Sequence, residues 1–114
     1  MSAVFVVDPR GKRDLGFLDW NPSRGMLLRV LGFLADEVED PALAADLREF
    51  VAGGYAFISL SSYTAEQGAE VMKVIREKLP AAVEEWLPGH EGARQHIAEL
   101  VELVEEAEAA PDAG

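Results

Sequence analysis

Apolar residues recur along the chain with two different spacings. A spacing of two residues predicts β-strands, and a spacing of three or four residues predicts helices. Residues 55–60 alternate in side-chain direction, and 3–7 is a short run rich in β-branched residues, so both predict β-strands. Five other stretches repeat apolar residues at the three- and four-residue spacing of one helix face. The predicted helices are about 23–36, 42–52, 65–79, 81–87 and 91–109.

The stretch from Gly53 to Leu79 organises the rest of the chain. It opens with two glycines, which end the preceding helix because glycine readily adopts the left-handed conformation found there. The strand 55–60 is mostly apolar on both faces, which predicts a strand inside the sheet rather than at its edge. Thr64 and Gln67 then have the spacing of a capping box, in which each side chain bonds the other residue's backbone N–H.

The least regular pattern lies near the amino terminus. Glycines and prolines break residues 8–22 into a loop, yet Phe17 to Trp20 are too apolar for a free tether. Residues 17–20 therefore either form a second short strand or pack beneath the domain as a loop. The next helix starts with Asn21 or with Ser23 as its cap, since both residue types accept backbone N–H bonds at that position.

Prolines and glycines also divide the second half of the chain. Pro80 has no backbone N–H, so the helix over 65–79 either kinks or restarts there. Pro88 and Gly89 separate the last two helices. We expect residues 1–110 to form a single globular domain, because no repeat or low-complexity linker interrupts them, and residues 111–114 to fray as a tail.

This order of elements predicts an α+β fold, an α-rich single domain with a small two- or three-stranded sheet. A two-stranded sheet is only marginally stable alone, so four or five helices must cover it. If strands 3–7 and 55–60 pair in parallel, the two helices between them form the crossover connection.

Composition excludes several classes of protein. A chain of 114 residues, 49% hydrophobic and 27% charged, fits one globular domain and not a disordered segment. Its apolar runs are too short to span a membrane, and no basic region precedes the first of them as in a secretory signal. Cysteine is absent, which excludes disulfides and thiolate metal sites. We expect a cytoplasmic protein that does not bind membranes.

The formal net charge of −11 is unevenly distributed. Residues 1–29 contain five basic and three acidic side chains, a balance of +2, whereas residues 30–114 contain five and eighteen, a balance of −13. Phosphate contacts need a basic face, so direct binding of nucleic acid is disfavoured. An acidic field favours encounter with a basic protein partner, although the same charge also serves solubility alone.

Reactive side chains lack the spacing that catalysis or metal binding needs. His90 and His96 are six residues apart, so they do not share one helix face as an i, i+4 zinc pair does. Ser59, Ser61 and Ser62 lie outside any nucleophile elbow and fit turn and capping roles. Phosphate-binding loops are missing, and adjacent carboxylates fit solvated helix surface. We predict no enzymatic activity, no catalytic or metal site and no cofactor.

Trp20 lies in a loop that also contains or adjoins several basic residues, namely Arg10, Lys12, Arg13 and Arg24. Tryptophan and arginine are typical anchors of protein interfaces, so this loop is a candidate partner-binding segment. A loop tucked under the core has the same composition, and the sequence leaves both interpretations open.

Two stretches resemble small bacterial proteins. Phe57-Ile-Ser-Leu-Ser-Ser-Tyr-Thr-Ala-Glu-Gln and the helix after it resemble a turn of bacterial immunity proteins, which neutralise a toxin made by the same cell. Trp20-Asn-Pro-Ser-Arg-Gly-Met-Leu-Leu-Arg-Val-Leu-Gly resembles a helix of related small bacterial proteins. The resemblance covers about a third of the chain, consists of helix starts, and lacks a tyrosine- or aspartate-rich recognition patch. It implies an immunity function and identifies no binding residues.

We therefore predict a small, acidic, non-enzymatic protein that occludes a basic toxin. The predicted partner-binding residues are Trp20, Glu84, Glu85, Glu99, Glu102 and Glu106.

Two other classes compete with this prediction. One is a self-associating structural or regulatory module, a helical homodimer formed through Trp86, Leu87 and Leu103. The other is an enzyme centred on His90, His96 and nearby carboxylates.

Overall fold

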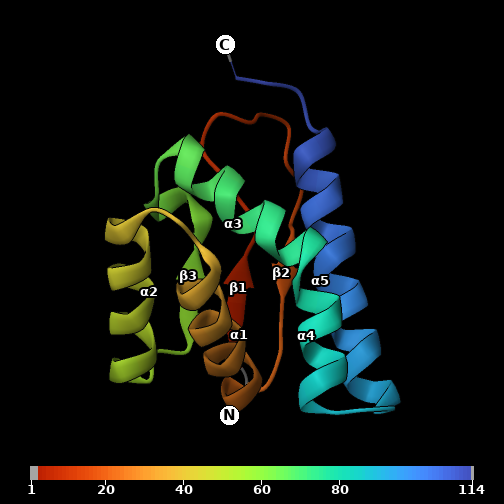
Figure 1. Ribbon diagram of the computed structural model, residues 1–114. Helices are drawn as coiled ribbons and strands as arrows, with labels where there is room; N and C mark the ends of the chain where they lie inside the picture. The colour runs from red at the N-terminus through yellow and green to blue at the C-terminus, as the bar shows by residue number, and fades with distance from the viewer. Residues whose placement is uncertain (1–2, 114) are drawn as a thin grey trace.

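A mixed sheet of three short strands lies at the centre of the computed structural model, which describes residues 3–113 (Figure 1). The strands are β1 (Val4–Val6), β2 (Asp19–Trp20) and β3 (Phe57–Ser59), in the spatial order β2-β1-β3. The central strand β1 is antiparallel to β2 and parallel to β3. The first and last strands therefore pair in parallel, which is the condition under which the two helices between them form a crossover connection.

Helices supply the rest of this α+β fold within residues 3–113, as predicted. They are α1 (Arg24–Glu37), α2 (Pro41–Gly53), α3 (Ala65–Glu77), α4 (Leu79–Trp86) and α5 (Glu91–Ala109), with a short 3₁₀ turn, η1 (Leu60–Ser62), before α3. The α1/α2 pair connects the parallel strands, and every predicted boundary agrees within two residues. Within the described residues, no helix is both long enough and apolar enough to cross a membrane.

The helices cover one face of the sheet, which we call the covered face. In the observed register, Phe5 of β1 lies opposite both Trp20 of β2 and Ile58 of β3. Neighbouring residues in register point to the same face, and all three side chains are at most 2% exposed. Figure 1 shows α1 and α3 in front of the strands. The main hydrophobic core therefore lies between this face and the helices.

The opposite face of the sheet, which we call the open face, is not covered by a helix. Val4 and Val6 of β1 point to it and are only partly buried, and Phe57 of β3 is 59% exposed. The prediction that strand 55–60 lies inside the sheet is wrong, since β3 is an edge strand. The central place goes to β1, because it is the strand that pairs with both others.

Local sequence signals determine where the helices begin and end. Ser23, not Asn21, caps α1, because its hydroxyl accepts the N–H of Met26. Thr64 and Gln67 form the predicted capping box of α3. A kink and a restart were both predicted at Pro80, and the structure shows a restart. α4 begins at Leu79, so Pro80 lies in its first turn, where a backbone N–H would have no acceptor within the helix and its absence breaks no helical hydrogen bond.

Residues 111–113, at the end of the described chain, pair with the loop at residues 11–13. The N–H of Arg13 donates to the Pro111 carbonyl, and the N–H of Ala113 donates to the Gly11 carbonyl. Lys12 lies 3.0 Å from the Asp112 carboxylate. This pairing with the 11–13 loop could not be read from the composition of residues 111–113, and the fraying of residues 111–114 stays a prediction; Gly114 lies outside the described residues.

Candidate functional site

Trp20 is a core residue and not an exposed anchor. Its side chain is 2% exposed and packs edge-to-face against Phe5, with ring centroids 6.5 Å apart. Its Nε1–H donates to the backbone carbonyl of His96 in α5, at 2.9 Å. Of the two forms predicted for residues 17–20, the structure shows a short strand, β2, at Asp19–Trp20. Trp20, predicted as a partner-binding residue, is buried instead, and its ring joins α5 to the sheet.

A groove runs between the last two helices, and we call it the α4/α5 groove. It has a volume of about 430 Å³. Its apolar residues come from both helices, and its charged residues stand at the rim. The lining residues are Pro80, Val83, Glu84, Arg94, Ile97, Ala98, Val101, Glu102 and Glu105. An apolar floor with an acidic rim suits a segment that presents both aliphatic and basic side chains.

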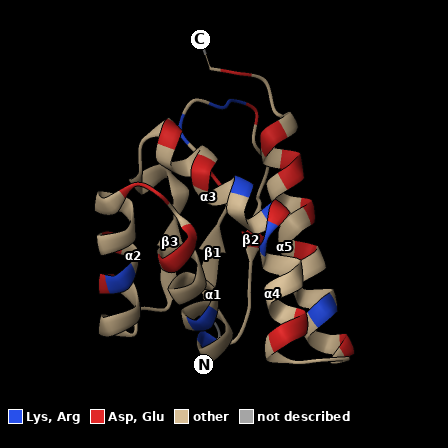
Figure 2. Cartoon of the chain, in the orientation of Figure 1, with Lys and Arg blue, Asp and Glu red and all other residues tan. Residues whose placement is uncertain are grey.

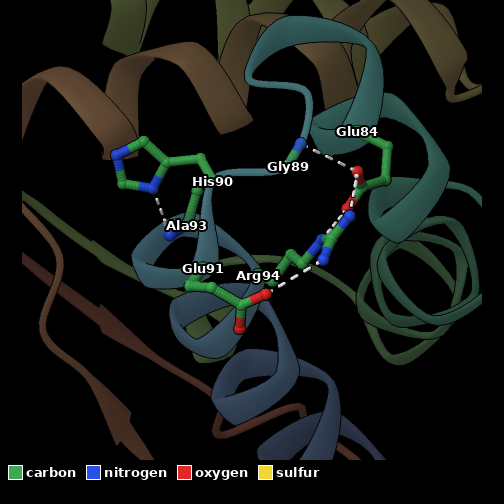
Figure 3. A network of polar contacts seen from close by, with 6 residues as sticks. All are labelled: Glu84, Gly89, His90, Glu91, Ala93 and Arg94. Carbon is green, nitrogen blue, oxygen red and sulfur yellow. Dashed lines mark hydrogen bonds and ion pairs between the residues drawn. The ribbon is translucent and has the colours of Figure 1, made fainter.

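One end of the groove is closed by an ion-pair network at the turn between the helices (Figure 3). Arg94 donates two hydrogen bonds to the Glu84 carboxylate, one of them at 2.9 Å from Nη2, and a third bond at 3.1 Å to Glu91. The Gly89 N–H also points to Glu84, at 3.4 Å. The bond from Arg94 lowers the pKa of Glu84, and Glu84 in turn raises the pKa of Arg94. This network fixes the spacing of the two helices.

Apart from Glu108, which pairs with Arg76 of α3, the other carboxylates of these two helices have no such partner within residues 3–113. Among the described residues, five glutamates of α4 and α5 form neither an ion pair within 4.0 Å nor a side-chain hydrogen bond: Glu85, Glu99, Glu102, Glu105 and Glu106. Figure 2 shows acidic residues following α5 along most of its length. Residues 79–109 contain eight glutamates and one arginine, a formal charge of −7 out of the total of −11.

These glutamates do not stabilise α5. Glu102 has like charges on the same side of the helix, Glu99 at i−3 and Glu106 at i+4. Each such pair lowers the stability of a helix by about 0.2–0.5 kcal/mol. Glu105 and Glu106 stand near the carboxyl end of the helix, where the helix dipole disfavours negative charge, and the last turn contains no basic residue. Local choices that oppose helix stability are typical of functional surfaces.

The structure separates the glutamates that the sequence grouped together. Glu84 and Glu102 line the groove, whereas Glu99 and Glu106 lie on the outer side of α5 beside it. Glu85 follows Glu84 by about 100° around α4 and so points away from the groove.

Two charged residues of the groove, and all of its apolar residues, were missing from the predicted set. Arg94 and Glu105 line the groove together with Ala98 and Val101. The signal was present in the sequence, because positions 94, 98, 101 and 105 follow the i, i+4, i+7, i+11 spacing of a single helix stripe. Which stripe faces α4 could not be read from that spacing alone.

The three residues predicted for a helical dimer do not share one surface. Trp86 faces α1, where it packs against Phe33 at 5.6 Å between ring centroids and has the Arg29 guanidinium over its ring at 4.7 Å. Leu103 is partly buried on the stripe of α5 that also carries His96, whose ring contacts Trp20. Leu87, at the end of α4, remains 39% exposed.

The two histidines lie apart in both position and role. His90 caps α5, since its Nδ1 accepts the N–H of Ala93 at 3.0 Å (Figure 3). His96 packs against Trp20, and its Nδ1 is buried without a hydrogen-bond partner. Within residues 3–113, no group of three or more histidine, aspartate or glutamate side chains is placed to hold a metal ion.

The serine cluster forms a structural link between the two parallel strands. The Ser59 hydroxyl donates to the Asp8 carboxylate at 2.7 Å, and the Ser61 N–H donates to the same group at 3.1 Å. Neither histidine takes part in these contacts. The cluster fastens the carboxyl ends of β1 and β3 and has the turn chemistry expected from the sequence.

Comparisons with protein-family models, with curated proteins and with solved structures found no match for this chain. No relative therefore assigns a role to a side chain of the α4/α5 groove. What the groove binds is inferred from its shape, its charge and its exposed apolar residues.

Proposed function

We propose that this chain is a non-enzymatic binding protein whose α4/α5 groove and adjacent glutamates hold a basic segment of a partner protein. The observation that supports this most directly is the set of five unpaired glutamates on these two helices. Because they cost helix stability and neutralise no cation of the chain, a cation from outside is their natural partner.

The partner segment that fits best is an amphipathic helix. Its aliphatic side chains would occupy the groove floor between Val83 and Val101, and its lysines or arginines would lie over Glu102 and Glu105. Glu99 and Glu106, on the outer side of α5, would extend the acidic field that guides the partner in.

Toxin neutralisation is the biological role that we propose for this binding. The resemblance to bacterial immunity proteins at Phe57–Gln67 supports it, as does the acidic charge, since an inhibitor that covers a basic protein needs no catalytic group. In this proposal the chain occludes a basic toxin domain by covering it with α4 and α5.

The test is a co-expression and binding experiment with the product of the neighbouring gene in the native host. We expect this chain to suppress that product's toxicity and to bind it with an affinity that falls as salt rises. The combined variant Glu99→Gln, Glu102→Gln and Glu106→Gln should lose roughly tenfold or more in affinity.

A matched control separates the surface from the net charge. The combined variant Glu39→Gln, Glu49→Gln and Glu66→Gln removes three charges elsewhere, from the α1–α2 turn, α2 and α3, and should retain most of the affinity. Equal losses in both variants would mean that only the overall charge matters, which contradicts a specific site. A neighbouring product that is neither toxic nor bound contradicts the neutralising role.

A second pair of variants tests the groove itself. Ala98 is exposed in the groove, and Ala45 is exposed on α2. Ala98→Trp fills the groove and should abolish binding of the partner segment, while Ala45→Trp should not. Unchanged binding by Ala98→Trp would show that the partner does not enter the groove.

A further inference from the structure

The open face of the sheet is apolar although no part of residues 3–113 covers it. Its outward side chains on the three strands are Val4, Val6, Asp19, Phe57 and Ser59. Phe17, which continues the alternation of β2, is 99% exposed. Tyr55 is 57% exposed at the margin of this face, with its ring 5.5 Å from that of Phe50. Three exposed aromatic side chains thus gather at one sheet.

The sequences of β1 and β3 make this exposure unusual. The two strands are parallel within a mixed sheet, and parallel strands that are buried on both faces have nearly continuous apolar sequences. Their sequences have the matching pattern, since Ala3 to Val7 is an unbroken apolar run and Tyr55 to Ile58 is apolar on both sides. The sequence is that of a doubly covered sheet, and the single chain covers one face.

We propose that the open face is an interface with a second copy of this chain. The packing would be face to face and two-fold, so that the same patch meets itself and Phe57 of each copy lies against the valines of the other. This interface is separate from the α4/α5 groove and does not depend on what the groove binds.

Charge distribution favours a second copy as the occupant. Two chains of charge −11 repel each other, so they associate only through a surface that keeps their acidic helices apart. On the open face, Asp19 is the one charged residue within the three strands, and the Asp8 carboxylate lies just beyond β1, where it accepts a hydrogen bond from the Ser59 hydroxyl. α5 lies on the side of the covered face, because Trp20 of that face donates to the His96 carbonyl.

The available area is sufficient for a weak dimer. Phe17, Tyr55 and Phe57 are 99%, 57% and 59% exposed, and an aromatic side chain has about 200 Å² of surface, so they expose about 430 Å² per copy. With the valines, two copies would bury about 1,000 Å², which is near the lower limit of specific interfaces. We therefore expect dissociation constants on the order of 10 µM to 1 mM.

The experiment is sedimentation equilibrium of the full chain over that concentration range, with three variants. Phe57→Thr removes the central aromatic side chain while keeping a residue that suits a strand, and Phe17→Thr does the same at the other edge. Leu87→Thr is the control, because Leu87 is an exposed apolar residue at the end of α4. Circular dichroism and urea unfolding verify that each variant is folded.

We expect the wild-type chain to dimerise and to do so more tightly at high salt, which screens the repulsion between copies. Phe57→Thr should weaken the dimer roughly tenfold or more, Phe17→Thr should weaken it less, and Leu87→Thr should leave it unchanged. NMR signals of Val4–Val6 and Phe57 should broaden as concentration rises. A chain that stays monomeric throughout overturns the proposal, and so does a dimer weakened by Leu87→Thr but not by Phe57→Thr.

Discussion

The helix pairs α1/α2 and α4/α5 are both hairpins of neighbouring helices, but they use their charged residues differently. α1 and α2 contain seven charged residues, and all but Glu49 have a partner within the described chain. Asp36 forms an ion pair with Arg48, and Glu37 forms one with Lys78. Asp46 accepts a hydrogen bond from Tyr63, Arg24 donates to the Gly54 carbonyl, and Arg29 lies over the Trp86 ring. α4 and α5 contain nine, of which five have none.

The difference separates charge that holds the fold together from charge that is available for binding. α1/α2 lies within the crossover between the parallel strands, and although most of its charged side chains are exposed, all but Glu49 contact a group of this chain. α4/α5 lies at the end of the chain, and the outer side of α5 faces solvent. The five unpaired glutamates of the second pair can bind another molecule without losing internal contacts, whereas in the first pair only Glu49 can.

The largest effect is expected where α5 joins the sheet. Trp20→Ala should lower the free energy of unfolding by about 3–5 kcal/mol, because it leaves a cavity in the core and removes the bond to the His96 carbonyl. Urea denaturation measures this change. Phe17→Ala, three residues earlier and 99% exposed, is the control and should change stability little. Equal effects of the two substitutions would contradict the assignment of Trp20 to the core.

A smaller effect is expected where α2 is joined to the start of α3. The Tyr63 hydroxyl donates to Asp46 at 2.5 Å, so Tyr63→Phe should cost about 1–3 kcal/mol. Burial, and then the bond to Asp46, raise the pKa of Tyr63. Tyrosine ionises near pH 10 in the unfolded chain. The contribution of the protonated Tyr63 hydroxyl to the free energy of unfolding is therefore complete below that pH and is lost as the pH rises above it.

Thermal unfolding from neutral to alkaline pH measures this loss. Tyr55→Phe is the control, because the Tyr55 ring is 57% exposed. Tyr63→Phe should flatten the alkaline fall in stability, and Tyr55→Phe should leave it as in the wild type. An alkaline fall of the same size in both variants would contradict the role of the Tyr63 pKa.

The cap of α2 should give a pH-dependent effect in acid. N–H donation from Leu43, followed by donation from the Gln67 side chain, lowers the pKa of Asp40. Ionised Asp40 therefore stabilises the fold fully above about pH 4, the ordinary pKa of aspartate in an unfolded chain. This stabilisation is lost as the pH falls from there through the lower pKa that Asp40 has in the folded chain. Asp40→Ala should lower the melting temperature at neutral pH. Asp40→Asn keeps an acceptor and should lose mainly the acid dependence.

The melting temperature as a function of pH decides the outcome. Glu39→Gln, at the neighbouring position, is the control for removing a carboxylate that does not cap the helix. If Asp40→Ala and Glu39→Gln gave the same melting curve at neutral pH, the cap would contribute nothing measurable.

The smallest effect should have the opposite sign. Glu99→Gln, Glu102→Gln and Glu106→Gln together should raise the stability of the chain slightly, by about 0.5 kcal/mol for each like-charge pair removed, and less in high salt. The triple variant at Glu39, Glu49 and Glu66 should show no such gain. Destabilisation of α5 by the first set would mean that its glutamates serve the fold, and the contrast with α1/α2 would disappear.

Much of the architecture could be predicted from local sequence signals. The capping box at Thr64, the break at Gly53 and Gly54, and the apolar stripes of the helices all act through residues close in sequence, so their effects could be worked out without the fold. The candidate site could be predicted only in part. The acidic character of the last two helices was evident, but the membership of the groove depends on how α4 is rotated against α5.

The sequence by itself determined the elements, their order and the excess of negative charge, because period, capping and composition are properties of neighbouring residues. Only the tertiary structure decided that Trp20 belongs to the core, that β3 lies at an edge, and that residues 111–113 pair with the 11–13 loop. It also decided which glutamates stand together at the groove and which aromatic residues stay exposed on the open face. These outcomes depend on contacts between residues far apart in sequence, whose geometry is set by the packing of the whole chain.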